Sequence, residues 1–347
     1  MVEPRSGLEF LPTYSVEEIS WPIRLDANES PYDMPPAVKA RILEKLSALP
    51  FNRYPELTAH SLKTTIAAGF GMKAANVLIG NGSSEILEKL CYAFGGAGRS
   101  IVYPSPSFSM YKIYVKLADS KPVPVALNAD YTLDADKLLE AANQAEASVI
   151  LLCNPNNPTG GVLPPEQIEY IVANTGSLVV IDEAYHEFYG KTSVDLLNKY
   201  QNVAIARTFS KAYGLAATRI GFLLTSESIA QILGKVILPY SVNALTLATA
   251  EIVYTMRQEY AASIAANSRE RARITTALSA IDGMTVYPSQ TNFLLVKSDN
   301  IAAMLEQLSA KDIGIRDFSK VPGLTNCIRI GVGTPTENDA VLEALTV

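Results

Sequence analysis

The feature of this sequence that most constrains its fold is a series of short apolar runs, rich in β-branched residues, that each end in turn-forming residues. Continuous apolar runs of this length suit strands that are buried on both faces, as in a parallel sheet. The segments between the runs, such as 84–94 and 165–173, show apolar residues at helical spacing. Strands that alternate with helices predict an α/β fold with a mostly parallel sheet flanked by helices. The predicted strands are residues 76–79, 100–103, 148–153, 178–181, 203–206 and 220–224.

The pattern changes in the last third of the chain, where a long helical stretch rich in Ala, Glu and Arg covers residues 243–281. The mixture of strands and helices after it predicts a smaller α+β domain, and the Pro-rich first residues predict an arm that packs on that domain. We therefore expect an N-terminal arm at 1–40, a large α/β domain at 41–245, and a linking helix with the small α+β domain at 246–347. The elements expected in the small domain are 291–296, 301–310, 327–331 and 337–345.

The composition excludes several classes of protein. The 29 Lys and Arg residues against 35 Asp and Glu residues give a net charge of −6, and no basic run occurs, so nucleic acid is not an expected partner. No stretch approaches 18 apolar residues and no signal-peptide pattern opens the chain, so we expect no membrane span and a cytoplasmic location. Three separated cysteines and only two histidines predict reduced thiols and no histidine-based metal site.

Polar residues gather directly after the predicted strands. Ligands of open parallel sheets bind beyond the carboxyl ends of the strands. Five strand ends with polar chemistry therefore predict one common site at that edge of the sheet. The segments concerned are residues 80–84, 105–108, 154–160, 182–185 and 208–211.

The residue types at these strand ends match the needs of pyridoxal 5′-phosphate (PLP). Lys211 supplies an amine for covalent attachment, and Asp182 supplies a carboxylate for the pyridine nitrogen. Arg219 and nearby hydroxyls suit the phosphate, and Phe108 offers an aromatic face for the ring. Singly, Asp182 also fits a helix cap and Lys211 a solvated turn, so the prediction rests on the ordered set. The hydroxyl residues are Ser83, Ser84, Thr208 and Ser210.

With these motifs in place, the chain resembles the fold-type I, class II PLP-dependent aminotransferases, and within them the histidinol-phosphate aminotransferases. The similarity spans nearly the whole sequence. Several of the motifs are shared by aminotransferases in general, so they indicate the superfamily more firmly than the substrate. The matching segments are residues 25–31, 53–56, 80–85, 154–160, 182–185, 207–219, 291–293 and 329–334.

The resemblance implies roles around the cofactor. Lys211 is the catalytic residue, which binds the cofactor covalently and moves the substrate proton. Phe108 stands where relatives often have Tyr, and Ser84 where an acidic residue is familiar. Tyr54 reaches the phosphate across a subunit interface, which implies a homodimer with shared active sites. The cofactor-binding set is Tyr54, Ser83, Ser84, Phe108, Asn157, Asp182, Tyr185, Thr208, Ser210, Lys211 and Arg219.

The resemblance also implies a substrate site. Arg329 matches the arginine that grips the substrate carboxylate with its planar fork, and Arg316 matches the arginine that holds the substrate phosphate. Tyr14 matches an arm tyrosine that closes over the substrate, and Asn28 and Asn157 complete the set. A surface ion pair with the next residue remains the alternative for Arg316, and core packing the alternative for Tyr14.

The implied reaction transfers an amino group between L-histidinol phosphate and 2-oxoglutarate, giving imidazole acetol phosphate and glutamate in histidine biosynthesis. Two enzymatic alternatives share the cofactor: an aromatic amino acid aminotransferase and a threonine-phosphate decarboxylase. A phosphate-binding Arg316 fits both phosphorylated substrates, so it separates these possibilities only in part. A PLP-binding regulator of the same fold would need an additional DNA-binding segment, for which the chain has no spare length or basic patch.

Overall fold

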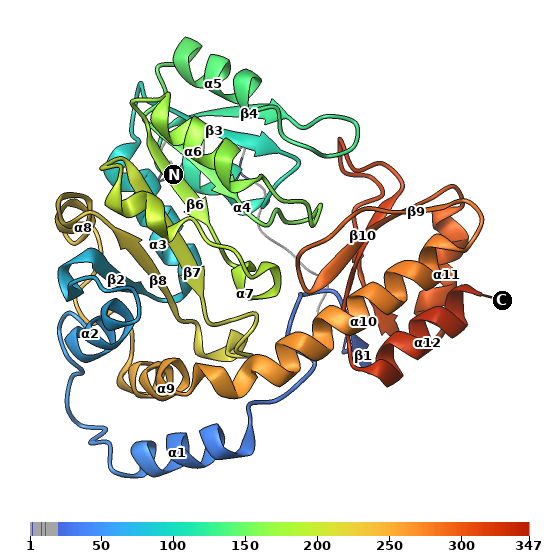
Figure 1. The fold of residues 1–347 in the computed structure, drawn as a ribbon, viewed down its shortest axis with the longest axis horizontal. Helices are drawn as coiled ribbons and strands as arrows, with labels where there is room; N and C mark the ends of the chain where they lie inside the picture. Colours follow the sequence, from blue (N-terminus) through green and yellow to red (C-terminus); the bar gives the residue numbers. More distant parts are fainter. Residues whose placement is uncertain (1, 3–7, 9–10, 12–19, 347) are drawn as a thin grey trace.

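The computed structural model describes residues 2, 8, 11 and 20–346, and it contains a large sheet, a smaller sheet and a short strand pair (Figure 1). A long helix runs between the two larger sheets. In the part of the chain that the structure describes, no helix is long and apolar enough to cross a membrane.

The large sheet has seven strands: β2 (Val77–Gly80), β3 (Ser100–Ser105), β4 (Lys121–Ala126), β5 (Val149–Cys153), β6 (Leu178–Asp182), β7 (Val203–Thr208) and β8 (Gly221–Thr225). Their order across the sheet is β2-β8-β7-β6-β5-β3-β4. Strand β8 is antiparallel to both neighbours, and the pairs from β7 to β4 are all parallel. The mostly parallel sheet predicted from the apolar runs is thus confirmed.

Helices cover both faces of this sheet because successive side chains of each strand point to opposite faces. In β6, Val179 and Ile181 pack in one apolar layer, whereas Leu178 and Val180 pack in the other. The first layer includes residues of α1 (Pro36–Ser47), α2 (His60–Ala68), α5 (Ala135–Gln144), α6 (Pro165–Ala173) and α9 (Ala244–Thr255). The second includes residues of α3 (Gly82–Phe94), α4 (Met110–Leu117) and α8 (Glu227–Leu233). Burial on both faces makes the sheet a firm base for residues at its edge.

The smaller unit is an antiparallel sheet covered by helices. It comprises β9 (Met284–Val286), β10 (Phe293–Ser298), β12 (Arg316–Asp317) and β13 (Cys327–Gly331), in the order β12-β13-β10-β9. Its apolar core takes residues from α10 (Ala261–Ser279), α11 (Ile301–Ala310) and α12 (Pro335–Leu345). Strand β1 (Ile23–Arg24) pairs in parallel with β11 (Ile313–Gly314), so the segment before α1 joins this unit. The remaining short elements are η2 (Ala74–Asn76), α7 (His186–Tyr189), η3 (Val194–Asn198), η4 (Ala216–Thr218) and η5 (Arg257–Tyr260).

Three details differ from the sequence expectations. Strand β4 was not among the predicted strands, because Pro122 and Pro124 interrupt its pattern; an edge strand tolerates such prolines since one side needs no partner. The predicted helical stretch at 243–281 is divided into α9 and α10 by η5. Helix α1 begins at Pro36, inside the predicted arm, and its Val38 is buried in the large core. The bounds of the three predicted segments stay predictions.

Candidate active site

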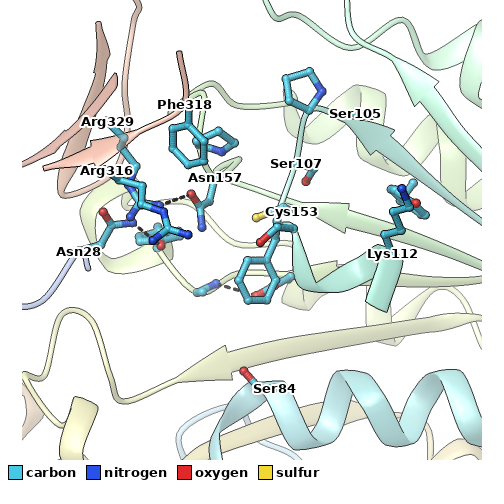
Figure 2. Close-up of a pocket in the computed structure, with 18 of the residues that line it drawn as sticks. Asn28, Ser84, Ser105, Ser107, Lys112, Cys153, Asn157, Arg316, Phe318 and Arg329 are labelled. Atoms are coloured by element: carbon cyan, nitrogen blue, oxygen red, sulfur yellow. Dashed lines mark hydrogen bonds between the residues drawn. The ribbon is translucent and has the colours of Figure 1, made fainter. Parts of the chain in front are cut away.

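A cavity of about 740 Å³ lies at the carboxyl ends of the large-sheet strands and reaches the small unit. It brings together all but two of the residues predicted for the site. Figure 2 labels five of them: Asn28, Ser84, Asn157, Arg316 and Arg329. Tyr54 does not line it, and Tyr14 lies outside the described residues. The predicted residues that do line it are Asn28, Ser83, Ser84, Phe108, Asn157, Asp182, Tyr185, Thr208, Ser210, Lys211, Arg219, Arg316 and Arg329.

Asp182 is a buried carboxylate at the end of β6, with 4% of its surface exposed. Burial raises its pKa to about 6, because a carboxylate loses hydration in a dry site. Two hydrogen bonds oppose this rise: the Tyr111 hydroxyl donates to Oδ2 at 2.9 Å, and the Ala184 amide donates to Oδ1 at 3.2 Å. The site therefore holds a carboxylate whose proton affinity is set by its surroundings.

Tyr111 is a site residue that the sequence did not reveal. It comes from α4, is fully buried, and packs its ring edge-on against Phe108, with 5.5 Å between centroids. Burial and the neighbouring carboxylate raise its pKa, so the phenol keeps the proton that it donates to Asp182. In the sequence, a tyrosine three residues after Phe108 is typical of core packing by an amphipathic helix. No sequence pattern links Tyr111 to Asp182.

Lys211 follows β7 and directs its amine toward the segment before α1. Nζ donates a hydrogen bond to the Ala27 carbonyl at 3.0 Å. Burial, followed by the positive charges of Arg329 and Arg219, lowers the pKa of Lys211 to about 8, while Glu29 opposes this shift. About a tenth of the amine is therefore unprotonated at pH 7, far more than for an ordinary lysine, and the unprotonated form is the nucleophile.

Tyr185 places a phenol in the same cavity. Its hydroxyl accepts a hydrogen bond from Asn28 Nδ2 at 2.9 Å, and burial raises its pKa while the charge of Arg329 opposes the rise. Asn28 is 2% exposed and adopts a left-handed backbone, with φ at 54°, which Asn tolerates better than most residues. The Asn292 side chain donates to the Asn28 carbonyl at 3.0 Å and holds this conformation.

One corner of the cavity is built from the start of α3, a short loop after β7 and Arg219. Ser83 and Ser84 lie in the first turn of α3, where unpaired amides and the helix dipole favour an anion. Arg219 Nη1 donates to Ser210 Oγ at 3.4 Å, and Thr208 Oγ1 donates to the same atom at 3.0 Å. Thr208, Ser210 and Arg219 are thus joined by hydrogen bonds, and together with the start of α3 this corner forms a cradle that suits a phosphate group.

Glycine is required on this corner because the backbone and Arg219 approach closely. A Cβ at Gly82 would lie 2.8 Å from Arg219 Nη2, and a Cβ at Gly221 would lie 2.3 Å from the Ser83 amide nitrogen. Gly82 also has a φ of 80°. A side chain at either position would displace the donors of the cradle.

Two arginines face the cavity from the small sheet. Arg316 and Arg329 are register partners on β12 and β13, so both side chains point to the same side (Figure 2). Arg329 donates to Asn157 Oδ1 at 2.7 Å and to the Asp26 carbonyl at 2.5 Å. Its guanidinium lies 5.3 Å from the Phe293 ring centroid and 5.7 Å from that of Phe318. This side of the cavity, with two arginines, suits substrates that carry two negative charges.

Tyr54 lies on the surface of this chain. Its side chain is 83% exposed, and its ring stacks on Tyr240 with 4.8 Å between centroids. Its predicted contact involves the phosphate of a second subunit, so the position of Tyr54 in one chain neither makes nor excludes that contact.

The residues also pass a chemical test for a carbonyl cofactor with a ring and a phosphate. The cavity holds one amine of lowered pKa, one buried carboxylate, an aromatic face at Phe108 and a separate cradle of hydroxyls with an arginine. Asn28 Oδ1 is buried and has no hydrogen-bond partner, as expected for an atom that faces a ligand. The donor set therefore fits a phosphorylated pyridine aldehyde.

Comparisons with known proteins agree with this chemistry. The family model for aminotransferase class I and II matches residues 22–345. The chain is 38% identical over 343 residues to a histidinol-phosphate aminotransferase from Thermoanaerobacter pseudethanolicus, covering 98% of this chain and 97% of the relative. It is also 38% identical over 341 residues to one from Thermococcus kodakarensis, covering 98% and 97%.

A solved structure is similar over most of its length. The histidinol-phosphate aminotransferase from Sinorhizobium meliloti, in complex with pyridoxal-5′-phosphate, superposes with a TM-score of 0.86 and is 29% identical. The match covers 94% of this chain and 90% of the solved one.

Proposed function

Because the chain belongs to the class I and II aminotransferases, we propose that it transfers an amino group between L-histidinol phosphate and 2-oxoglutarate. The products are imidazole acetol phosphate and glutamate, and the reaction belongs to histidine biosynthesis. The observation that carries this function is the pair Arg316 and Arg329, which face the Lys211 cavity from adjacent strands. The names of relatives that match nearly the whole chain support the same reaction. We place the enzyme in the cytoplasm.

The enzymes of this family depend on PLP, and the cavity supplies a partner for each part of that cofactor. We assign the pyridine nitrogen to Asp182 and the face of the ring to Phe108. We assign the phenolic oxygen of PLP to Asn157 and Tyr185, as hydrogen-bond partners. We assign the PLP phosphate to the cradle, which comprises Ser83, Ser84, Thr208, Ser210 and Arg219.

Bound PLP supplies covalent attachment for the amino group and withdraws electrons from the substrate carbon. The chain's own residues do the rest. The Lys211 amine, with its pKa near 8, would take the proton from the substrate Cα and deliver it to the C4′ carbon of the cofactor. Asp182 holds a proton on the ring nitrogen, because its buried carboxylate has no other cation within hydrogen-bond distance among the described residues.

The substrate site must accept a carboxylate in one half-reaction and a phosphate ester in the other. Arg329 is the planar donor for the carboxylate, since its guanidinium is already oriented by Asn157 and by two aromatic rings. Arg316 is the cation for the phosphate ester. Both arginines lie in a partly closed cavity, where charge pairs are stronger than in open water.

The active unit in this proposal is a homodimer. Large apolar side chains are exposed near Tyr54, which is itself exposed, and such patches mark interfaces. A small cavity of about 250 Å³, lined by Leu57, Leu238 and Tyr240 among others, makes this surface concave. In the dimer, Tyr54 of one subunit reaches the phosphate held by the other. The exposed apolar residues of this surface are Phe51, Tyr54, Leu57, Leu238 and Tyr240.

A direct test compares amino donors. Purified holoenzyme is given histidinol phosphate, phenylalanine or threonine phosphate with 2-oxoglutarate, and glutamate formation and carbon dioxide release are both measured. We expect the highest kcat/KM with histidinol phosphate and no carbon dioxide from threonine phosphate. A preference for phenylalanine would replace the proposal with the aromatic aminotransferase, and carbon dioxide release would replace it with the decarboxylase.

A further inference from the structure

The loop between β12 and β13 forms an apolar wall of the cavity. We call residues 318–324 the wall loop; Phe318, Val321, Pro322 and Leu324 all line the cavity. The loop is held together by its own backbone, since the Val321 amide donates to the Phe318 carbonyl at 2.8 Å and the Leu324 amide to the Val321 carbonyl at 2.9 Å. These bonds shape the loop but do not attach it to the large unit.

Tyr131 attaches the wall loop to the large unit. It lies in the loop between β4 and α5, which extends toward the small unit in Figure 1. The Tyr131 hydroxyl donates to the Gly323 carbonyl at 3.0 Å and lies 3.7 Å from Cys327 Sγ. Its ring packs edge-on against Tyr287, with 4.7 Å between centroids. One side chain of the large unit thus contacts three places around the wall loop.

The backbone presents Tyr131 in a single orientation. Its φ is 64°, a left-handed conformation that is rare for a bulky residue and costs energy. The turn is closed by the Tyr131 amide, which donates to the Asn128 carbonyl, and by the Asn128 amide, which donates to the Thr132 carbonyl, both at 2.9 Å. A further bond joins the Thr132 amide to Asp130 Oδ1 at 3.0 Å. Such a built turn points to a positional role for its side chain.

The position of the wall loop bears directly on the substrate arginines. The Phe318 ring centroid lies 5.7 Å from the Arg329 guanidinium, and Arg316 lies in β12, two residues before the wall loop. A wall that stays in place keeps water from both cations and so strengthens their attraction for anions. The apolar side chains of the wall offer contact to a flat ring, whereas glutamate carries no ring.

We propose that Tyr131 is a positioning residue that attaches the wall loop to the large unit, and that the attached wall contacts the ring of the phosphorylated amino donor. The substrate part of this inference rests on the proposed function. The attachment itself does not, because it involves only contacts within the chain.

Hydrogen exchange of the purified holoenzyme, without substrate, tests the attachment. Tyr131→Phe removes the bond to Gly323 and keeps the ring, so the amides of the wall loop should exchange about 3- to 10-fold faster. Tyr170→Phe is the matched control, since it removes a tyrosine hydroxyl bond to Asp136 within the large unit. Equal exchange in Tyr131→Phe and the wild type would overturn the attachment, whatever the substrate of the enzyme.

Half-reaction kinetics test the role of the wall. For Tyr131→Phe we expect KM for histidinol phosphate to rise about 3- to 10-fold while kcat and the KM for glutamate stay near wild type. Tyr170→Phe should change none of these values. Faster exchange with equal losses for both donors, or with no loss for either, would overturn the contact between wall and donor ring. Absence of turnover with histidinol phosphate in the wild type would instead contradict the proposed function.

Discussion

The two flanks of the cavity are built in different ways. On the large-sheet flank, the side chains lie at or just after the strand ends: Asp182 is the last residue of β6, and Lys211 comes three residues after β7. One hydrogen-bonded sheet with helices on both faces holds all of them. On the small-unit flank, Arg316 and Arg329 stand on a separate sheet, and contacts such as Tyr131 with Gly323 set its distance from the first flank.

The difference separates the residues that carry out proton transfer from the residues that select the substrate. Proton transfer needs fixed geometry, and a sheet buried on both faces supplies it. Substrates of different length need a boundary built separately from the reacting groups, and the small sheet, joined to the large unit by side-chain contacts such as those of Tyr131 and Arg329, supplies it. Variants on the first flank should therefore affect every substrate alike, whereas variants on the second should affect one substrate more than another.

The largest expected effect belongs to Lys211→Ala. One group serves as covalent anchor and proton carrier, so we expect turnover to fall by about 10⁴-fold or more with every donor. The visible absorption of the bound cofactor should change as well, and the spectrum and steady-state rates measure both. Normal rates and a normal spectrum would contradict the chemical role that we assign to Lys211 and to the large-sheet flank.

The paired arginines test the second flank. Arg316→Ala should lower kcat/KM for histidinol phosphate by about 30- to several thousand-fold, because a buried phosphate loses one of its cations. Arg329→Ala should damage the glutamate half-reaction, which loses its fork-shaped donor. Single-turnover conversion of the cofactor with each donor measures the ratio of the losses. If Arg316→Ala spares histidinol phosphate, the assignment of the phosphate ester to this flank is wrong.

Tyr54→Phe asks whether a second chain completes the first flank. Removing one hydroxyl from the phosphate contact should weaken PLP binding by about 10- to 150-fold and leave the dimer intact. Equilibrium titration with PLP measures the affinity, and sedimentation measures the assembly. Mixing this variant with Lys211→Ala should restore part of the activity in heterodimers. No restoration after confirmed subunit exchange would mean that Tyr54 does not serve the partner's site.

A further expected effect concerns the stability of the large-sheet flank. The pKa of Asp182 is about 6 in the folded chain and 3.8 in the unfolded chain, so its ionisation opposes folding above pH 6. Asp182→Asn should raise the free energy of unfolding of the cofactor-free protein by up to about 3 kcal/mol at pH 8. The gain should shrink as the pH falls from 6 toward 4, and urea titrations across that range measure it. Asp195→Asn, the same substitution at an exposed position, is the control.

The first flank was largely predictable from sequence, and the second was not. Apolar runs predicted strands such as β6 and β7, and the rule that ligands meet the carboxyl ends of parallel strands predicted one site for their polar ends. Resemblance alone pointed to Arg316 and Arg329. The bonds of Tyr111 to Asp182 and of Tyr131 to Gly323 join residues 71 and 192 positions apart, and no local pattern encodes them.

The pairing of β1 with β11 has a consequence for protein synthesis. Residues 23–24 leave the ribosome early, but their partners at 313–314 follow about 290 residues later. At about 5–20 residues per second, the wait is about 15–60 s. During that time the large sheet can form, while Ala27 and Asn28, which contact Lys211 and Tyr185, have no small unit to hold them in place. The nascent chain thus carries a nearly complete cofactor flank long before it carries a finished active site.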